Sequence, residues 1–243
     1  MIGTIVNVAG ITAGGVIGLT RKKPLPPQTE SFFKAALGAF TVFYGLRLTW
    51  MSLNGSGLHV LKQLLIAILA MMLGKLIGHL LGLQKLSNQL GQIARESIVH
   101  ANPASPTRAS EGFKTCTALF CAAPLGILGA IQDGLSGYFY PLAIKGVMEA
   151  LATLGFISLF GWSVMLAALP VLAFQGTITL LCAQFLKPYL QTHGPIGMID
   201  SINAVGGLLV FSVALVILGL KRIELADYLP GLVIAPLITW VWH

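Results

Sequence analysis

Long apolar runs separated by short polar breaks dominate the chain, and a run of about 20 residues can cross the hydrocarbon core of a bilayer as a helix. The run from residue 139 to residue 186 is too long for one crossing and fits two, with a tight turn near Phe160-Gly161-Trp162. The pattern therefore predicts an all-α transmembrane helix bundle that forms one domain over residues 1–243. Its eight predicted spans are residues 2–20, 33–50, 58–81, 115–131, 139–159, 162–186, 202–220 and 228–242.

The polar segment after the third predicted span keeps a helical spacing of apolar residues, which are Leu83, Leu86, Leu90 and Ile93. Polar residues fill the positions between them, as is typical of an amphipathic helix, here over residues 83–98. We expect this helix either to lie on the inner membrane surface or to extend the third span into a contact with a partner. Two prolines and several Ser and Thr residues predict a flexible loop over residues 101–112, so that residues 83–114 form a cytoplasmic segment.

The composition agrees with a membrane protein that has the lipid bilayer as its surroundings. Hydrophobic residues make up 56% of the 243 positions, charged residues 9%, and the mean hydropathy is +0.84, whereas about a quarter of the residues in a soluble domain are charged. The net charge of +7 comes from Lys and Arg at the edges of apolar runs, which indicates membrane topology and not nucleic-acid binding. The cysteines Cys116, Cys121 and Cys182 lie inside apolar runs and are interpreted as small buried hydrophobic residues.

Lys and Arg are enriched in cytoplasmic loops, so their distribution predicts the orientation. With the N-terminus outside, three basic residues fall on the outer face, namely Arg47, Lys62 and Lys187. Eleven fall on the inner face: Arg21, Lys22, Lys23, Lys34, Lys75, Lys85, Arg95, Arg108, Lys114, Lys221 and Arg222. Both termini are therefore predicted to be outside.

A comparison of the chain with itself at a shift of 168 residues indicates an inverted repeat. Residues 36–43 fall on residues 204–211 with four of eight positions identical, and Asn7 falls on Gln175. The repeated units would be spans 1–3 and 6–8, which run through the membrane in opposite directions, as in many transporters. The alternative is a chance match in a chain rich in Ala, Gly, Leu and Val, with each amide making an ordinary interhelical hydrogen bond.

Charged and amide side chains inside apolar runs are costly in lipid, so they are candidate ligands of a substrate or ion. They are Asn7, Gln132, Asp133, Lys145, Glu149 and Gln175. Lys145 and Glu149 are four residues apart and can pair on one helix face. Either they only neutralise each other, or Glu149 binds a cation or a proton while Lys145 is a competing tether. Asp133 is expected at the outer rim, as a vestibule ligand or a turn residue.

Other patterns add packing sites and no chemistry. Gly10, Gly14 and Gly18 lie on one face of the first span and predict a close helix contact, either within one subunit or between the subunits of a homodimer. The sequence contains no metal-ligand spacing, no cofactor signature and no enzyme motif such as GxSxG, a P-loop or HExxH. We therefore expect a protein that is not an enzyme and needs no cofactor or metal.

Four blocks carry a family resemblance: GTIVNVAGITAGGVIGL, LFCAAPLGILGAIQDGLSG, LPVLAFQGTITLL and AVGGLLVFSVALVILGLKRIELADYLPGLVIAPL. In this order they resemble the YqgA and YdfK type of uncharacterised bacterial inner-membrane protein. The resemblance implies a multi-pass protein of the bacterial plasma membrane, and it supplies no substrate or catalytic residue. The positions that match polar or glycine positions of that family are Asn7, Gln132, Asp133, Gly134 and Gln175, and Lys145 matches a lysine.

Two functions from different classes fit these patterns. The first is a membrane transporter or channel for a small cation, another ion or a polar solute, with a polar site near the membrane midplane. The second is a non-transporting scaffold or accessory subunit that binds a partner through the amphipathic helix 83–98. The polar residues inside the spans favour the first function.

Overall fold

The computed structural model describes residues 1–21, 25–53 and 55–242, and helices form most of this part of the chain. The helices are α1 (Ile2–Thr20), α2 (Pro27–Ser52), α3 (Gly57–Leu80), α4 (Leu83–Val99), α5 (Arg108–Ala122), α6 (Pro124–Ser136), α7 (Tyr140–Phe160), α8 (Ala168–Leu181), α9 (Lys187–His193), α10 (Met198–Ile217), α11 (Leu225–Tyr228) and α12 (Gly231–Val241). A 3₁₀ helix, Gly161–Ala167, and a π-helical turn, Cys182–Leu186, flank α8. The described chain has no strand, as predicted.

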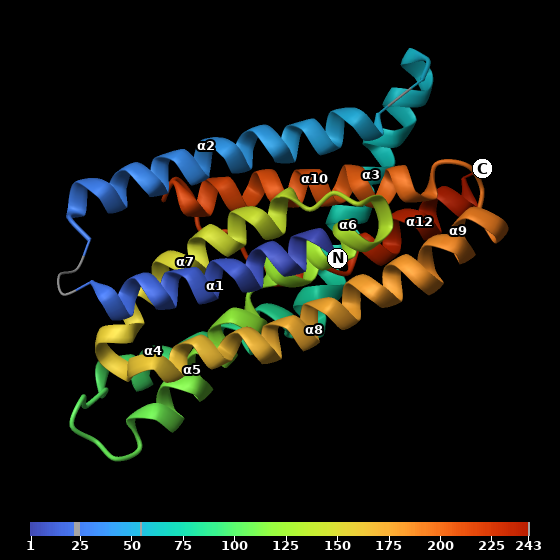
Figure 1. Ribbon diagram of the computed structural model, residues 1–243. Helices are drawn as coiled ribbons and strands as arrows, with labels where there is room; N and C mark the ends of the chain where they lie inside the picture. The colour runs from blue at the N-terminus through green and yellow to red at the C-terminus, as the bar shows by residue number, and fades with distance from the viewer. Residues whose placement is uncertain (22–24, 54, 243) are drawn as a thin grey trace.

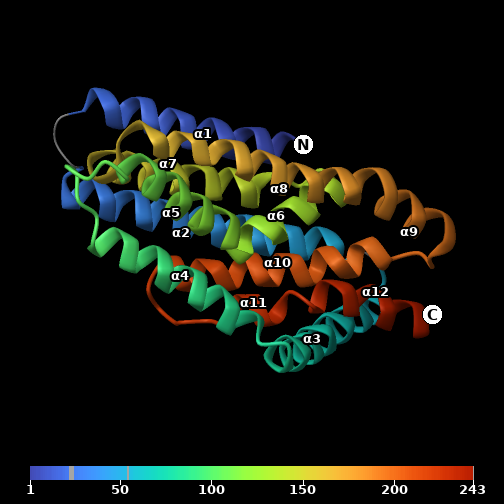
Figure 2. The same ribbon diagram turned by 90° about the horizontal axis from the view of Figure 1, so that it is seen from below.

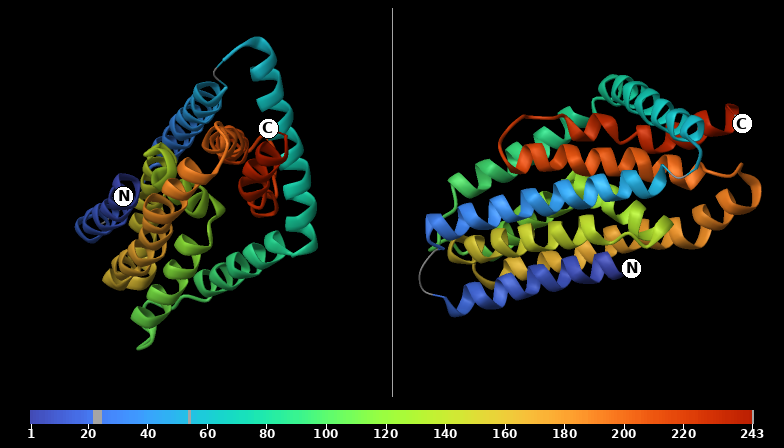
Figure 3. Two further views of the ribbon diagram at one scale, coloured as in Figure 1. Left: turned by 90° about the vertical axis from the view of Figure 1, so that its right-hand side faces the viewer. Right: turned by 90° about the horizontal axis from the view of Figure 1, so that it is seen from above.

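Helices α1, α2, α7, α8 and α10 run roughly along one direction and form the bundle (Figure 1). Seen from below, α3, α11 and α12 lie on one side of the bundle and α1 on the opposite side (Figure 2). Seen along the bundle, α3 and α4 are viewed from the side while α1 and α10 are nearly end-on (Figure 3). Both chain ends point towards the same end of the bundle. The side of the membrane that they face stays a prediction.

Three helix pairs pack with opposite chain directions: α1 with α8, α2 with α10, and α3 with α12. Their contacts show the opposite directions. Thr4 contacts Thr179 while Asn7 contacts Gln175, and Lys62 donates to the Trp242 carbonyl while Gly74 lies against Gly231. In the second pair, Gly38 lies against Leu218 and Gly45 against Gly207. Each pair brings together helices far apart in the sequence.

The chain reverses direction between α7 and α8, as predicted. Helix α1 is parallel to α7, because Gly10 faces Gly146 and Gly14 faces Ala150. It is antiparallel to α8, as its contacts with Gln175 and Thr179 show. Gly161 makes the reversal with φ +78°, a conformation that L side chains rarely adopt. The turn expected near this residue is therefore confirmed.

Helix length and hydropathy support a multi-pass helical protein, with fewer candidate spans than the eight expected. Four stretches of the described chain are long and apolar enough: Ile2–Thr20, Gly57–Leu80, Tyr140–His193 and Met198–Ile217. The bent pair α5 and α6 makes a fifth if it counts as one span. Tyr140–His193 contains the reversal at Gly161. The total of eight spans stays a prediction.

The predicted span over residues 115–131 falls on two helices, and whether they cross the membrane as one span stays a prediction. The helices are α5 and α6, which bend by 58° at Ala123. Pro124 has no N–H and disfavours a helical conformation for the residue before it, so Ala123 is extended with ψ 121°. Helix α5 also begins at Arg108, so the expected loop over residues 101–112 is shorter than predicted.

The amphipathic segment forms α4 close to its predicted bounds. Asp227 accepts a hydrogen bond from the Gln84 backbone N–H at 2.7 Å, and the Gln84 side chain accepts one from the Ala226 N–H at 3.0 Å. These reciprocal bonds fix the first turn of α4 to α11. Lys22, Lys23 and Asn54, which belong to the predicted loops, lie outside the described residues.

Glycines allow α1 to approach α7 closely. A Cβ atom at Gly10 or Gly14 would collide with the backbone of Gly146 or Ala150, and one at Gly18 would lie 3.0 Å from Ile157. This glycine face therefore packs within the chain, and a homodimer would need another surface. The prediction of a homodimer stays untested.

Candidate functional site

The break between α5 and α6 leaves a backbone acceptor that an intact helix would fill. In a continuous helix the Phe120 carbonyl would accept from the N–H of residue 124, but residue 124 is proline. The Lys145 ammonium takes that place and donates to the Phe120 oxygen at 2.9 Å. A cation at the C-terminal end of α5 is also favoured by the helix dipole. The sequence thus places a buried positive charge at a helix break.

Lys145 also forms an ion pair with Glu149, one helical turn along α7. The two residues are 3% and 5% exposed, so both charges are inside the protein. Only Oε1 of Glu149 is paired, whereas Oε2 is buried and has no hydrogen-bond partner in the described structure. The predicted pair exists, and it leaves one carboxylate oxygen available.

Two amides lie beside this ion pair. Asn7 Nδ2 donates to Gln175 Oε1 at 2.9 Å, and both side chains are fully buried. The Asn7 side chain also faces the Glu149 carboxyl group. The remaining amide atoms, Asn7 Oδ1 and Gln175 Nε2, have no partner among the described residues. Gln175 Nε2 is therefore an unpaired donor, and Asn7 Oδ1 and Glu149 Oε2 are unpaired acceptors.

Gly126 of α6 lies against Lys145 of α7 and Gln175 of α8. A Cβ atom there would lie 3.0 Å from Gln175 Nε2 and 3.0 Å from Lys145 Cε. Only a residue without a side chain lets both approach the first turn of α6. Residues from α1, α6, α7 and α8 thus meet at the break, and we call Asn7, Lys145, Glu149 and Gln175 the central cluster.

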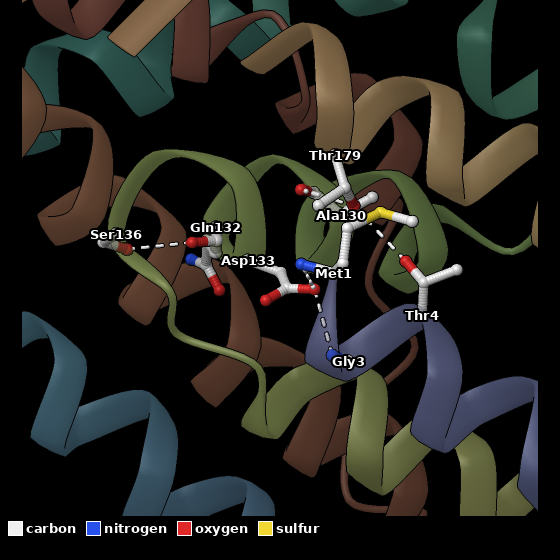
Figure 4. A network of polar contacts seen from close by, with 8 residues as sticks. All are labelled: Met1, Gly3, Thr4, Ala130, Gln132, Asp133, Ser136 and Thr179. Carbon is white, nitrogen blue, oxygen red and sulfur yellow. Dashed lines mark hydrogen bonds and ion pairs between the residues drawn. The ribbon is translucent and has the colours of Figure 1, made fainter. Parts of the chain in front are cut away.

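A second polar layer, drawn in Figure 4, involves the residues that precede Asn7 on α1. Asp133 Oδ2 accepts from the Gly3 N–H at 3.0 Å and pairs with the Met1 amino group at 3.0 Å. Thr4 and Thr179 share a hydrogen bond of 3.3 Å, and Thr179 donates to the Ala130 carbonyl. Asp133 is 5% exposed within α6, so it lies inside the protein and not in an exposed turn, and its expected place at the outer rim stays a prediction. Packing of α1 over α6 covers it.

Gln132 is buried on the other side of α6. Its side chain is fully buried against Gly206 of α10, where a Cβ atom would collide with Nε2. Neither amide atom has a partner in the described structure. Ser136, one turn later, donates to the Gln132 carbonyl at 2.9 Å and to Asn203 Oδ1 at 3.2 Å. Gln132 and Asp133 therefore do not join the central cluster.

Three tyrosines, Tyr44, Tyr138 and Tyr140, pack together beyond the C-terminal end of α6. Tyr138 donates from its hydroxyl to the Tyr44 carbonyl at 2.6 Å, while the rings of Tyr44 and Tyr140 stack with centroids 4.0 Å apart. Burial raises the pKa of the Tyr138 hydroxyl to about 12, so it remains a donor at neutral pH. The contact ties the start of α7 to α2 beside the second polar layer.

Comparison with known proteins agrees with the membrane fold. The chain matches the family described as "Protein of unknown function (DUF554)" over residues 2–240. The chain belongs to this family. It is 30% identical over 243 residues to the uncharacterized membrane protein YdfK of Bacillus subtilis, and 28% identical over 244 residues to the uncharacterized protein YqgA of Escherichia coli. Each alignment covers 100% of this chain and 97% of the relative. No solved structure was found to match.

This DUF554 chain has an apolar cavity of about 400 Å³ on the α4 side of the break. The apolar face of helix α4 forms one wall of the cavity. Pro124 at the break and Phe174, the residue before Gln175, lie on the opposite wall. The lining includes Leu86, Leu90, Thr117, Cys121, Pro124 and Phe174. The Thr117 hydroxyl is buried without a partner in the described structure. The cavity and the central cluster thus share the break as a common wall.

Sequence reasoning missed several parts of the site in this DUF554 member. Phe120 contributes a carbonyl, Gly126 contributes space, and Asn203 and Ser136 form a polar contact beside Gln132. Pro124 inside an apolar run is the one signal that could have revealed the break. Among the described residues, no group of three or more His, Cys, Asp or Glu side chains could hold a metal ion.

Proposed function

We propose that this protein is a transporter or channel for a small ion or polar solute and that the central cluster is its membrane-embedded site. The observation that carries the proposal is Lys145, which joins the carbonyl end of a broken helix to the carboxylate of Glu149. Charged residues inside membrane proteins generally mark substrate or ion pathways. Discontinuous helices near the midplane form many transporter sites, because their free ends offer partial charges.

The helix pairing supports an inverted repeat as the frame of this site. The predicted copies are α1–α3 and α8–α12, and each helix of the first copy packs against its counterpart in the opposite direction. Asn7 and Gln175, which the shift of 168 residues aligns, are hydrogen bonded to each other. A pseudo-twofold axis between them would bring equivalent residues together in this way. Rocking of one copy against the other could then expose the site alternately.

The scaffold function remains a second candidate because of α4. Lys85, Arg95 and Glu96 are exposed on this helix, and the Asp227 contact fixes its first turn. Such a helix can bind a partner on its polar side while its apolar side covers the cavity. Removal of residues 83–98 would then abolish partner binding and leave the bundle folded.

A proteoliposome flux assay tests the transport proposal. We expect saturable flux for at least one member of a panel of cations, anions and small metabolites. Glu149→Gln should change that flux at least tenfold in protein that remains folded, although its unfolding temperature falls because Lys145 loses its counter-charge. Glu224→Gln, at an exposed position, is the matched control and should leave flux unchanged. Absence of any flux in folded protein, or equal flux in Glu149→Gln, would reject transport through this site.

A further inference from the structure

The central cluster contains the elements of an anion site. Lys145 supplies a buried ammonium, and Gln175 supplies an Nε2 donor that has no partner in the described structure. Both lie against Gly126, in the first turn of the 13-residue helix α6. Pro124 has no N–H and the Gly126 N–H donates to the Ala123 carbonyl at 2.8 Å, so α6 contributes here mainly the positive end of its dipole, which favours anions. Three features of like polarity therefore converge on one point.

In this structure the Glu149 carboxylate is the anion that pairs with Lys145. Its Oε1 is paired with Lys145, while its Oε2 is buried without a partner. A proton on Oε2 would neutralise Glu149 and leave the Lys145 ammonium without a counter-charge. A buried charge without a partner is costly, so the ammonium would then favour an incoming anion. In such an exchange, proton uptake by Glu149 would be coupled to anion binding.

The groups that face Glu149 allow this exchange. Lys145 lies on the same helix, and Asn7 faces it from α1. The thiols of Cys116 and Cys121, on α5, lie near enough to interact with its charge. Among the described residues, no second carboxylate shifts the charge balance of Glu149. Glu149 is accordingly the acid that exchanges the proton in this cluster.

The adjoining cavity defines the body of the anion. Its volume of about 400 Å³ and its apolar lining suit a short hydrocarbon chain. Cys121 and Pro124 line the cavity, and Phe120, whose carbonyl accepts from Lys145, directly precedes Cys121. An anion whose charged group reaches Lys145 past the break would leave its apolar body in the cavity. Ala122 and Pro124, which flank the break at Ala123, line the cavity on the side that faces α4.

We propose that the central cluster and the cavity under α4 together bind a small organic carboxylate with an apolar body, and that Glu149 takes up a proton when the carboxylate replaces it on Lys145. This inference rests on the proposed transport function and names its substrate class. It also gives the cavity a role, which is to bind the apolar part of the substrate.

Binding of straight-chain carboxylates from acetate to octanoate to the purified protein in nanodiscs tests the proposal. Affinity should rise about fourfold for each methylene that the cavity buries, and then level off. Hexanol and hexylamine serve as ligand controls and should bind at least tenfold more weakly than hexanoate. Proton release or uptake in weak buffer should show about one proton taken up for each carboxylate bound. Equal binding of hexylamine, or affinity independent of chain length, would overturn the proposal.

Two variants of opposite effect separate this mechanism from simple loss of fold. Lys145→Met should weaken hexanoate binding at least tenfold. Glu149→Gln, which mimics the protonated acid, should bind hexanoate at least as tightly as the original protein but without proton uptake. Loss of binding in Glu149→Gln would contradict the exchange.

A cavity variant keeps the test valid if Lys145→Met does not fold. Ala118→Phe fills the cavity and should shift the preferred acid to a shorter chain while acetate binding is retained. Ala104→Phe, at an exposed loop position, is the control and should keep the original preference. Unchanged chain-length preference in Ala118→Phe would overturn the cavity assignment. Glu149-dependent flux of another solute, without carboxylate binding, would reject this inference and leave the proposed function intact.

Discussion

The Lys145 ammonium donates to the carbonyl oxygen of Phe120 at 2.9 Å, in the place of the backbone N–H that Pro124 lacks. A side chain from α7 thus completes the end of α5. Its second contact, with Glu149, balances its charge inside the bundle. The helix break and the ion pair are consequently one structural unit, and a change in either should disturb the other.

Lys145→Met should be strongly destabilising because it leaves the Glu149 carboxylate and the Phe120 carbonyl buried without a partner. Breaking a buried ion pair from one side costs about 3–5 kcal/mol. The double variant Lys145→Met with Glu149→Leu should recover part of this loss, since it removes both charges. Thermal unfolding in detergent measures the effect. Lys85→Met, at an exposed position of α4, is the control. An equal loss of stability in this variant would show that Lys145 has no special structural role.

Pro124→Ala should separate site geometry from stability. The new N–H can donate to the Phe120 carbonyl and compete with Lys145, and it favours a straighter path from α5 to α6. We expect flux to fall at least tenfold without a lower unfolding temperature. Pro188→Ala, at the exposed start of α9, serves as the control. Normal flux in Pro124→Ala would show that the break is not part of the transport site.

Local patterns in the sequence predict much of this fold. The first apolar run predicts a span over residues 2–20, and α1 is Ile2–Thr20. The turn at Gly161 follows from the length of the apolar run, and the pairing of Lys145 with Glu149 follows from helical spacing. These features depend on neighbours in the chain, so periodicity is enough to find them.

The features that sequence reasoning missed depend on tertiary packing. Gln132 and Asp133 are flanked by a glycine and resemble a turn, yet α1 and α10 bury them within a helix. The polar groups gathered from α1, α6, α7 and α8 carry no common local signal. Pro124 can be seen in the sequence. Only the structure shows that Lys145 donates to the Phe120 carbonyl in place of the N–H that Pro124 lacks.

Gly14→Ala should weaken the contact between α1 and α7. Its Cβ would collide with the Ala150 backbone, which cannot move aside as a side chain can. Overpacking of this kind costs typically about 1–3 kcal/mol. Gly155→Ala is a matched control in α7, because a Cβ there meets nothing within 4 Å. It should be neutral or slightly stabilising, since Ala is the better helix former. Equal unfolding temperatures for both variants would contradict the packing role.

Asp227→Ala should loosen α4 from α11. It removes the acceptor for the Gln84 N–H and the partner of His79, which lies 3.7 Å from Asp227. Loss of an N-terminal cap costs about 1 kcal/mol. Hydrogen exchange in the first turn of α4 should accelerate while α10 remains protected. Unchanged exchange in α4 would show that other contacts hold this helix.

A double-mutant cycle on Asn7 and Gln175 tests the contact that the repeat aligns. Interhelical hydrogen bonds in membrane proteins average about 0.6 kcal/mol, so Asn7→Ala and Gln175→Ala should be coupled by roughly this amount. Their partner atoms are 2.9 Å apart and fully buried, which favours a value above that average. The cycle of Asn7→Ala with Thr177→Ala is the control, because Thr177 is exposed and bonds within its own helix. Coupling in the control but not in the amide pair would mean that the two amides act independently.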